Sequence, residues 1–589
     1  MSGAVREVDA IIVGLGWTGS IIAKELADAG LSVLALERGP DRRMPFGGKG
    51  HQRTDEINGS VHRKYVQSLA DETFTVRHRS GETAVPYRQI GSFKPGFGVG
   101  GAGLHWSGTH FRALPEDMRL ASDLQERFGR GFVPEHMELR DYPVSFEELE
   151  PSFDFFEKVC GTTGVAGMLN GVLQPGGNPF EGSRSDQFPL PPNPLYASAE
   201  LFAQAARQAG YHPFPIPASN ASGHYTNPYG CSMSPCKASG FCSDYLCLND
   251  AKASPNLNIL PALFGQPNFE YLANAQVLKV NLDKSGVRAT GVTYLDQSGR
   301  EQTQSAAMVF LCASTLFNVH LMLLSGIGKP YDPRTRKGVV GRNYTYQNVS
   351  KVNLFFDRDV QANPFMGIGG AGIAIDDFNG HQLDNATVGF VGGGIIAARQ
   401  PGTGPIRGIP LPDGAPNWGE GWKEAVARHF RHTAYFEVQA SCMPHPDRYL
   451  DLDPTYTDSF GRPLLRITFD WDENEVAASQ YLTGKARELA TSLGPVAIKS
   501  NERPRGGHYD LTTYQTSHNN GGAIMGESPE NSALNRYLQS WDVPNVFAIG
   551  ANAFPQTSAY NPTGLVGALA YWSARNVVER YTRVETALI

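Results

Sequence analysis

Residues 8–37 read VDAIIVGLGWTGSIIAKELADAGLSVLALE, and their pattern is that of a strand, a helix and a second strand. Gly14, Gly16 and Gly19 lie between the first apolar run and the helix. Glycine there permits a tight turn and lets a pyrophosphate approach the helix N-terminus. Glu37 ends the second strand, 18 residues after Gly19, near the offset of about 20 expected for a carboxylate that binds a ribose hydroxyl. The pattern predicts a dinucleotide-binding β-α-β unit; a glycine turn in another α/β protein is the alternative.

The composition excludes several classes of protein. The chain has 589 residues, of which 41% are hydrophobic and 19% charged, and its formal net charge is −7. This composition is typical of a globular protein with a large core. We expect no nucleic-acid partner, because no basic block is present to neutralise phosphates. No apolar run approaches the roughly 20 residues of a membrane span, and a strand pattern begins too early for a signal peptide. Membrane association and export would need a partner.

The rest of the chain alternates between two kinds of pattern. The segment from about 39 to 89 is polar and is interpreted as an excursion over the surface. Apolar runs at 268–283, 289–296 and 305–314 predict strands that meander back to a parallel sheet. From about 346 to 510, strand-like segments alternate with Gly/Pro loops and one long helical pattern, which is typical of an inserted antiparallel sheet with helices. The last 75 or so residues regain strand and helix character.

We therefore predict an α/β protein, α+β overall, with a discontinuous Rossmann-like nucleotide domain and an inserted antiparallel-sheet domain that binds substrate. The predicted nucleotide domain comprises residues 1–115, 190–345 and 511–589, with a cysteine-rich insert at 228–255; the predicted substrate domain comprises 116–189 and 346–510.

Further glycine-rich stretches carry a resemblance to a known family. They read GFGVGGAGLHWSG (96–108), LLSGIG (323–328), HNNGGAIMG (518–526), VFAIGANAFPQ (546–556) and NPTGLVGALA (561–570). In this order they resemble the glucose-methanol-choline (GMC) oxidoreductases over nearly the full length, which implies the fold of that family and FAD as cofactor. The length, the LHWSG form and a cysteine cluster resemble more closely the flavoprotein subunits of membrane-bound sugar and sugar-acid dehydrogenases. One departure is STLFNVH (314–320), which lacks the prolines common there.

The resemblance implies a pair of catalytic residues. Oxidising an alcohol on a flavin requires a neutral base that takes the hydroxyl proton while a hydride leaves the same carbon. His518 is at the position of the family's active-site histidine, and Asn561 is at that of its partner. An amide at Asn561 could hold the substrate oxygen without competing for the proton. The alternatives are an ordinary hydrogen-bonded histidine and a turn-forming asparagine before Pro562.

Other positions are implied to contact the cofactor. His105, in LHWSG, resembles a histidine that some relatives bond covalently to the flavin; a histidine packed beside a noncovalent flavin is the alternative. Glycines lacking Cβ would let the backbone lie against the flavin and its phosphates. The positions that the resemblance implies in cofactor binding are Gly100, Gly101, Gly103, Gly550 and Asn552.

Four of the seven cysteines fall within 17 residues, at Cys231, Cys236, Cys242 and Cys247. Soft thiolates at such spacing can wrap an iron-sulfur core. The resemblance implies a [3Fe-4S] centre on the last three, because Ser239 stands where a fourth cysteine is expected; Cys231 is the other candidate for a fourth ligand. Disulfides and zinc are the alternatives.

An iron-sulfur centre accepts electrons singly, which favours a dehydrogenase over an oxidase. The resemblance implies a cytochrome c subunit and a small subunit that supplies the export signal, at the periplasmic face of the inner membrane, with the cytoplasm as the alternative location. The implied reaction is hydride transfer from a secondary alcohol of a sugar acid or sugar to flavin N5, with gluconate to 2-ketogluconate favoured. The alternatives are a sugar, fructose or glycoside dehydrogenase or oxidase of the same fold, and a catalytically silent scaffold.

Overall fold

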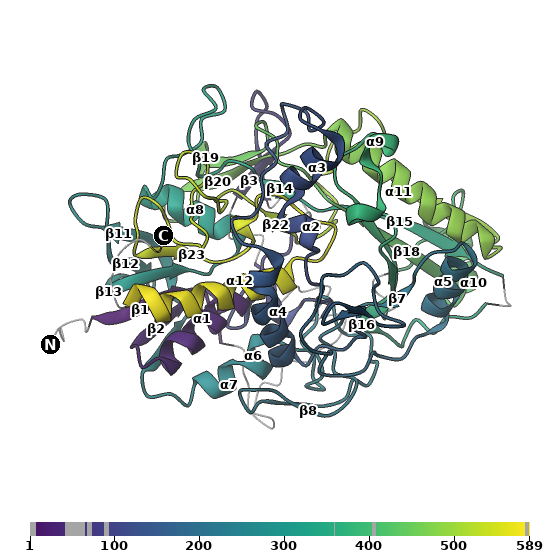
Figure 1. The fold of residues 1–589 in the computed structure, drawn as a ribbon, viewed down its shortest axis with the longest axis horizontal. Helices are drawn as coiled ribbons and strands as arrows, with labels where there is room; N and C mark the ends of the chain where they lie inside the picture. The colour runs from purple at the N-terminus through teal and green to yellow at the C-terminus, as the bar shows by residue number, and fades with distance from the viewer. Residues whose placement is uncertain are drawn as a thin grey trace.

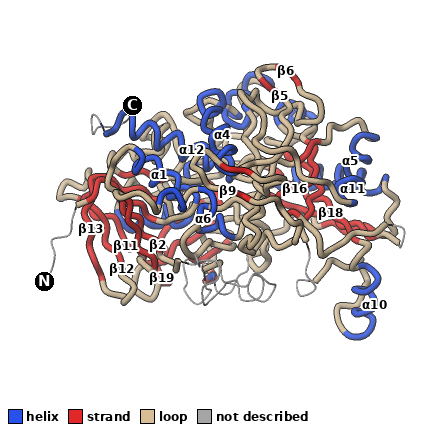
Figure 2. The backbone as a smooth tube through the Cα atoms, turned by 90° about the horizontal axis from the view of Figure 1, so that it is seen from below, coloured by secondary structure: helices blue, strands red, loops and turns tan. Residues whose placement is uncertain are grey.

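The computed structural model describes residues 7–41, 65–67, 74–87, 93–357, 360–402, 408–582 and 588. Most of the segment predicted as a surface excursion lies outside these residues. Two large sheets lie at opposite ends of the molecule (Figures 1 and 2). The first sheet contains, in spatial order, β10 (Phe269–Ala273), β2 (Val33–Glu37), β1 (Val8–Val13), β13 (Glu301–Leu311), β12 (Ala289–Leu295) and β11 (Gln276–Leu282), with β23 (Val546–Ala548) paired to β13.

The predicted β-α-β unit forms the middle of this sheet. β1 runs parallel to both β2 and β13, and Ile11 lies opposite Leu34 and Val309. All of β2 and the last four residues of β1 are buried, as expected for strands of a parallel sheet covered on both faces. α1 (Trp17–Asp28) follows the glycine turn and buries Ile21 and Ile22 in the same core. Burial of each such side chain stabilises the fold by about 1.5–3 kcal/mol.

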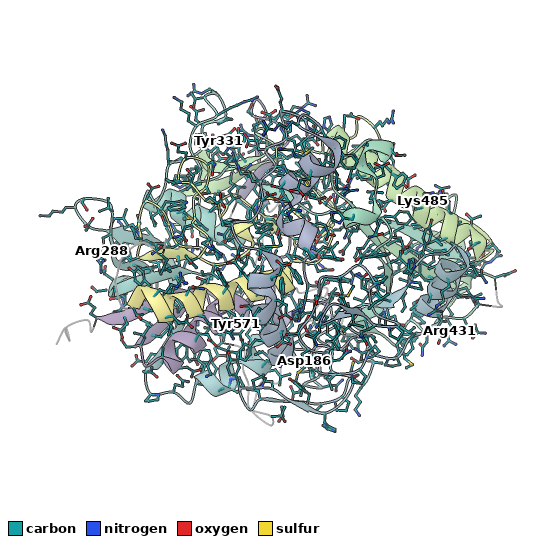
Figure 3. All side chains as sticks on the ribbon, in the orientation of Figure 1. Asp186, Arg288, Tyr331, Arg431, Lys485 and Tyr571 are labelled. Atoms are coloured by element: carbon teal, nitrogen blue, oxygen red, sulfur yellow. The ribbon has the colours of Figure 1, made fainter. Side chains whose placement is uncertain are left out.

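The end of the chain returns to the first sheet, as its pattern predicts. β23 adds to β13 in parallel, with Phe547 opposite Phe310. α12 (Thr563–Asn576) then packs against α1 and α4 (Phe146–Cys160), which Figure 1 shows crossing it. Tyr571 lies on the buried side of α12 (Figure 3). The sheet is therefore built from segments more than 500 residues apart, which confirms a discontinuous first unit.

The second sheet is antiparallel, and its two faces differ. Its spatial order is β21 (Ala497–Ser500), β15 (Asn348–Phe355), β18 (Thr433–Ala440), β17 (Gly394–Gln400), β16 (Ile368–Ile375) and β7 (Phe214–Pro215). Alternate residues such as Phe436 and Ile396 pack against α5 (Ala197–Gln208) and α11 (Glu473–Ser492). Successive side chains point to opposite faces of a strand, so the residues between them form the other face.

Smaller elements connect these two parts. A third sheet has the order β19 (Tyr449–Thr457), β20 (Pro463–Thr468), β3 (Phe74–Arg77) and β4 (Val85–Pro86). The two-stranded pairs are β14 (Thr345–Tyr346) with β22 (Asn519–Asn520), β5 (Met168–Leu169) with β6 (Val172–Leu173), and β8 (Tyr225–Thr226) with β9 (Ser232–Met233). The remaining α-helices are α2 (Pro115–Met118), α3 (Leu120–Phe128), α6 (Pro255–Asn258), α7 (Leu260–Leu263), α8 (Thr315–Ser325), α9 (Asn385–Val388) and α10 (Gly419–His429). Short 3-10 turns are η3 (Gly101–Leu104), η4 (Gly380–Gln382) and η6 (Ala551–Ala553), and a π-helical turn, η7 (Val577–Tyr581), extends α12.

The domain boundaries read from the sequence stay a prediction. α5 and β7, within the predicted nucleotide segment 190–345, pack on the second sheet, and β3, within segment 1–115, pairs with β20. None of the helices in the described part of the chain is long and apolar enough to span a bilayer.

Candidate active site

A cavity of about 810 Å³ extends from the glycine turn of the first sheet to the open face of the second. Gly14, Gly16 and Glu37 line one end. His105, His518 and Asn561 line it as well, so the structure brings most of the sequence-predicted site residues to one space. Side chains of the second sheet that line the cavity are Val349, Lys351, Asn353, Arg399, Tyr435, Glu437 and Gln439.

A different contact accounts for glycine at each of the three positions of the first turn. A Cβ on Gly14, whose φ is +94°, would lie 2.8 Å from the Cys312 carbonyl oxygen. A Cβ on Gly19 would lie 2.0 Å from the Gly14 carbonyl oxygen. Gly16 is different, because a Cβ there would meet only atoms of Gly100 and Gly101 at 3.8 Å or more. The protein itself has room for a side chain at Gly16, so a ligand in the cavity is what would require glycine there.

Glu37 is buried at the end of β2 and holds the turn. Its Oε2 accepts a hydrogen bond from the Leu15 amide at 3.0 Å, and its Oε1 accepts one from the Gly39 amide at 2.9 Å. Burial raises the pKa of this carboxyl, and the two amides act in the opposite direction. Backbone donors therefore fix the carboxyl at the end of the cavity beside the glycine turn, and its contact with a ribose stays a prediction.

The second glycine-rich loop packs on the first. Gly101 and Gly103 line the cavity. A Cβ on Gly100 would lie 2.0 Å from Asn256 Oδ1, and one on Gly103 would lie 2.5 Å from the Pro255 ring. Packing against neighbouring protein atoms thus accounts for Gly100 and Gly103, and their contact with a cofactor stays a prediction.

His105 follows this loop and is buried. Its Nε2 has no hydrogen-bond partner within the described ranges, although the residue lines the cavity. Burial lowers the pKa of His105 to about 4, so the imidazole is neutral. His105 thus brings to the cavity wall a buried nitrogen that no described group satisfies, and such a polar atom calls for a partner.

His518 lies directly before β22, which pairs with β14 and so fixes its position. Its Nδ1 lies 2.9 Å from Gln347 Oε1. The Gln347 amide nitrogen donates to the carbonyls of Ala440 and Ser558, which makes Oε1 the end that faces His518. An amide oxygen only accepts, so His518 Nδ1 carries the proton and Nε2 is the acceptor nitrogen.

Asn561 faces this acceptor nitrogen. Its Nδ2 lies 3.3 Å from His518 Nε2, and its Oδ1 accepts a hydrogen bond from Arg399 Nη2 at 3.0 Å. Burial and the charge of Arg399 lower the pKa of His518 to about 4, and Glu437 acts in the opposite direction. The site therefore holds a neutral imidazole, oriented from behind by Gln347 and flanked by an amide whose orientation Arg399 sets.

Gly550 and Asn552 have separate places. Gly550 lines the cavity. Asn552 is buried behind the loop, where its Oδ1 accepts a hydrogen bond from Asn318 Nδ2 at 2.8 Å and its Nδ2 donates to the Ala548 carbonyl at 3.2 Å. Asn552 thus braces the loop, and its direct contact with a cofactor stays a prediction.

The cysteine-rich insert lies against the cavity wall. All seven cysteines are free thiols, and so the structure does not support the disulfide alternative. Burial raises the pKa of Cys236 to about 11, and the charges of Cys242 and Cys247 act in the same direction. The pKa of Cys231 responds instead to burial and to Lys24 on α1. Cys242 and Cys247 thus act electrostatically on Cys236, whereas none of these three acts on Cys231.

Lys252 ties this insert to the loop that carries His105. It is buried, and its Nζ, with three donors, lies 2.7 Å from each of the carbonyl oxygens of Trp106, Cys242 and Tyr245 and 3.2 Å from that of Leu104. Across residues that the structure describes, the only three ligand-type side chains whose ligand atoms all lie within 4.8 Å of one another are His136, His445 and Asp472, which do not line the cavity. The three thiols are more widely spaced than a single ion requires.

Sequence reasoning missed Arg399, Glu437 and Gln347. Arg399 and Glu437 point into the cavity only because of the register of β17 and β18. Gln347 contacts His518 across 171 residues of chain. No local motif marks these positions; alternation along strands already assigned to the second sheet was the one available signal for Arg399 and Glu437.

Comparison with known proteins decides the family. The chain is 51% identical over 99% of its length to the gluconate 2-dehydrogenase flavoprotein of Pantoea cypripedii, 95% of which is covered. Two models of the GMC oxidoreductase family match residues 192–349 and 444–570. This chain belongs to the GMC oxidoreductase family. The chain is also 24% identical to the fructose dehydrogenase large subunit of Gluconobacter japonicus, with 98% of each chain covered.

A solved structure supports the GMC fold. Pyridoxine 4-oxidase from Mesorbium loti aligns with a TM-score of 0.60 and 16% identity, covering 98% of this chain and all of the other. At that identity the likeness concerns the fold alone. FAD is the cofactor that the GMC family implies, and the glycine turn, Glu37 and the unpartnered His105 nitrogen fit it. The prediction of an FAD-dependent oxidoreductase is confirmed.

Replacing Gly16 with alanine is expected to weaken FAD binding without unfolding the protein. The protein has room for the added methyl group, so the cost falls on the bound pyrophosphate, at about 1–3 kcal/mol or about 5- to 150-fold in Kd. Bound flavin per chain after dialysis against dilute FAD, determined in a His105→Ala background so that the flavin is held only non-covalently, measures the effect. Gly484→Ala, in open space on α11, is the matched control. Unchanged flavin binding in Gly16→Ala would contradict this placement of the cofactor.

Proposed function

We propose that this chain is the flavoprotein subunit of a dehydrogenase that oxidises a secondary alcohol of a sugar acid, with gluconate to 2-ketogluconate favoured, by hydride transfer to N5 of bound FAD. The observation that carries the proposal is the unprotonated His518 Nε2, with Asn561 Nδ2 at 3.3 Å, on the wall of a cavity that also contains the dinucleotide turn. The 51% identity to a gluconate 2-dehydrogenase flavoprotein supports the substrate class.

His518 and Asn561 divide the chemistry. The substrate hydroxyl donates to His518 Nε2, which takes its proton as the hydride leaves the same carbon. Asn561 Nδ2, now 3.3 Å from that nitrogen, can donate to the substrate oxygen and stabilise the charge that develops there. FAD, when bound, supplies the acceptor for two electrons. Both side chains are partly buried at the cavity wall, which strengthens these hydrogen bonds relative to those in open water.

The cysteine-rich insert suits onward electron transfer. We propose that Cys236, Cys242 and Cys247 hold an iron-sulfur centre, [3Fe-4S] in type, that passes electrons singly to a cytochrome c subunit. Their mutual charge effects and the carbonyl contacts of Lys252, which join the insert to the His105 loop, support this placement. Two relatives bear the names flavoprotein and large subunit, which supports assembly with partners, and we propose such a complex, with a small export-signal subunit, at the periplasmic face of the inner membrane.

His105 is proposed as the site of a covalent link to the flavin. Its Nε2 is buried, unpartnered in the described structure and on the cavity wall, and its neutral imidazole is the nucleophilic form. Denatured protein that releases all its yellow colour into the supernatant would rule the link out.

Anaerobic titration tests the proposed function. The purified protein is mixed with a panel of gluconate, fructose, 2-ketogluconate, sorbitol and glucose while its absorption spectrum is recorded. We expect gluconate to bleach the flavin at the lowest concentration and the protein to contain iron. Bleaching by no member of the panel would support a silent scaffold. Rapid peroxide formation in air, with no iron present, would support an oxidase of the same fold.

A further inference from the structure

Arg399 occupies a distinct place on β17. Its neighbours Ile396 and Ala398 pack toward α5 and α11, so Arg399 points the other way, into the cavity. The residue is 7% exposed, and an arginine is almost never buried unless it is paired.

Hydrogen bonds within the protein occupy some of the N–H donors of the Arg399 guanidinium. Nε donates to Glu437 Oε1 at 2.5 Å, Nη1 donates to Thr109 Oγ1 at 2.8 Å, and Nη2 donates to Asn561 Oδ1 at 3.0 Å. Arginine has five N–H donors. Two of them, one on each terminal nitrogen, have no partner in the part of the chain that the structure describes, and a carboxylate accepts such a pair as a fork.

At the His518 end of the cavity, the formal charges of Arg399, Lys351 and Glu437 sum to +1. Glu437 offsets Arg399, and Lys351 Nζ lies 3.9 Å from Glu437 Oε2. The other carboxylates that line the cavity are Glu37, held by the Leu15 and Gly39 amides, and Asp244, paired with Lys94 at 2.7 Å. A substrate that brings one negative charge therefore neutralises the catalytic end, whereas a neutral sugar leaves it positive.

Arg399 also lies at the right place relative to the reacting carbon. Its Nη2 reaches Asn561, and Asn561 reaches His518 Nε2 at 3.3 Å. In a 2-hydroxy acid the carboxyl carbon is bonded directly to the carbon that is oxidised, so its carboxylate must lie beside the base. In oxidation at a distant carbon it would lie several bonds away.

We propose that Arg399 forms a carboxylate-binding subsite, which selects 2-hydroxy acids over neutral sugars and places C2 against His518. This inference rests on the proposed function and adds to it the residue that recognises the acid. Glu437 positions the guanidinium, and Lys351 adds the charge that makes the subsite cationic.

Binding of 2-deoxygluconate, which has the carboxylate but lacks the reacting hydroxyl, tests the subsite without turnover. The holoenzyme is titrated and the perturbation of the oxidised flavin spectrum gives Kd. Arg399→Lys keeps the charge but loses the fork, and we expect its Kd to rise about 10- to 100-fold. Arg431→Lys, on the exposed edge of the molecule (Figure 3), is the matched control with an unchanged Kd.

A second measurement needs no variant. Wild-type protein should bind 2-deoxygluconate at least about 10-fold more tightly than the neutral 2-deoxygluconamide. Equal affinity for the two, or an unchanged Kd in Arg399→Lys, would overturn the subsite alone, provided that gluconate bleaches the wild-type flavin. If no sugar or sugar acid bleaches it, the proposed function itself fails.

Discussion

Replacing His518 with alanine is expected to slow flavin reduction by gluconate about 10²- to 10⁴-fold, the usual contribution of a positioned general base. The loss should be in the rate of bleaching at saturating substrate, because the carboxylate contact to Arg399 remains. Stopped-flow absorbance under anaerobic conditions measures it. The bound flavin should keep its oxidised spectrum, which shows that the fold survives.

Gln347→Leu is the companion variant for His518. Removing Oε1 frees the imidazole to adopt either tautomer, so we expect a smaller loss of the bleaching rate than for His518→Ala.

The pH dependence of the bleaching rate gives a second test of the base. The base acts when neutral, and burial lowers the pKa of His518 to about 4. The rate in wild-type protein should therefore be level at neutral pH and fall as pH drops through about 4. Near-wild-type bleaching in His518→Ala would refute the role of base.

Replacing Cys242 with serine is expected to block electron transfer to a one-electron acceptor while leaving flavin reduction by gluconate intact. The thiol is buried, and its sulfur accepts a hydrogen bond from the Gly369 amide at 3.2 Å, so serine fits the space but is a poor ligand for iron. We expect iron to be lost and reduction of a one-electron acceptor to fall at least about 10-fold. Flavin bleaching by gluconate should persist. Iron analysis, electron paramagnetic resonance and steady-state assays with cytochrome c measure these effects.

Cys231→Ser is the matched control for the insert. Cys231 responds to Lys24 and burial rather than to the other three thiols, so its replacement should leave iron content unchanged. Loss of iron in Cys231→Ser would make it the fourth ligand. Wild-type protein purified without iron, but active with the one-electron acceptor, would contradict the proposed route.

The sequence predicts the fold where local pattern and glycine spacing act together. Residues 8–37 contain a complete β-α-β signal, and its strands, helix and turn are present in the structure. The meander and the return of residues 546–576 to the first sheet are present as well, because their apolar runs are long and regular. The places of α5 and β7 depend on which sheet covers them, and no local pattern contains that information.

The site is predicted less completely, for a physical reason. His518 and Asn561 stand in short motifs, and the structure brings their side chains to 3.3 Å. Gln347, between β14 and β15, sets the tautomer of His518, and Arg399, on β17, sets the orientation of the Asn561 amide. Such contacts depend on strand register and on closure between distant segments, which residue type and spacing do not specify.

Deuterium at C2 of gluconate gives the most direct test of the account. Anaerobic single-turnover bleaching of the flavin is followed with gluconate and with [2-²H]gluconate at saturating concentration. The account predicts that gluconate bleaches the flavin and that deuteration at C2 slows this step. Bleaching that is equally fast with both substrates, or slowed only by deuterium at another carbon, would contradict hydride transfer from C2 beside His518.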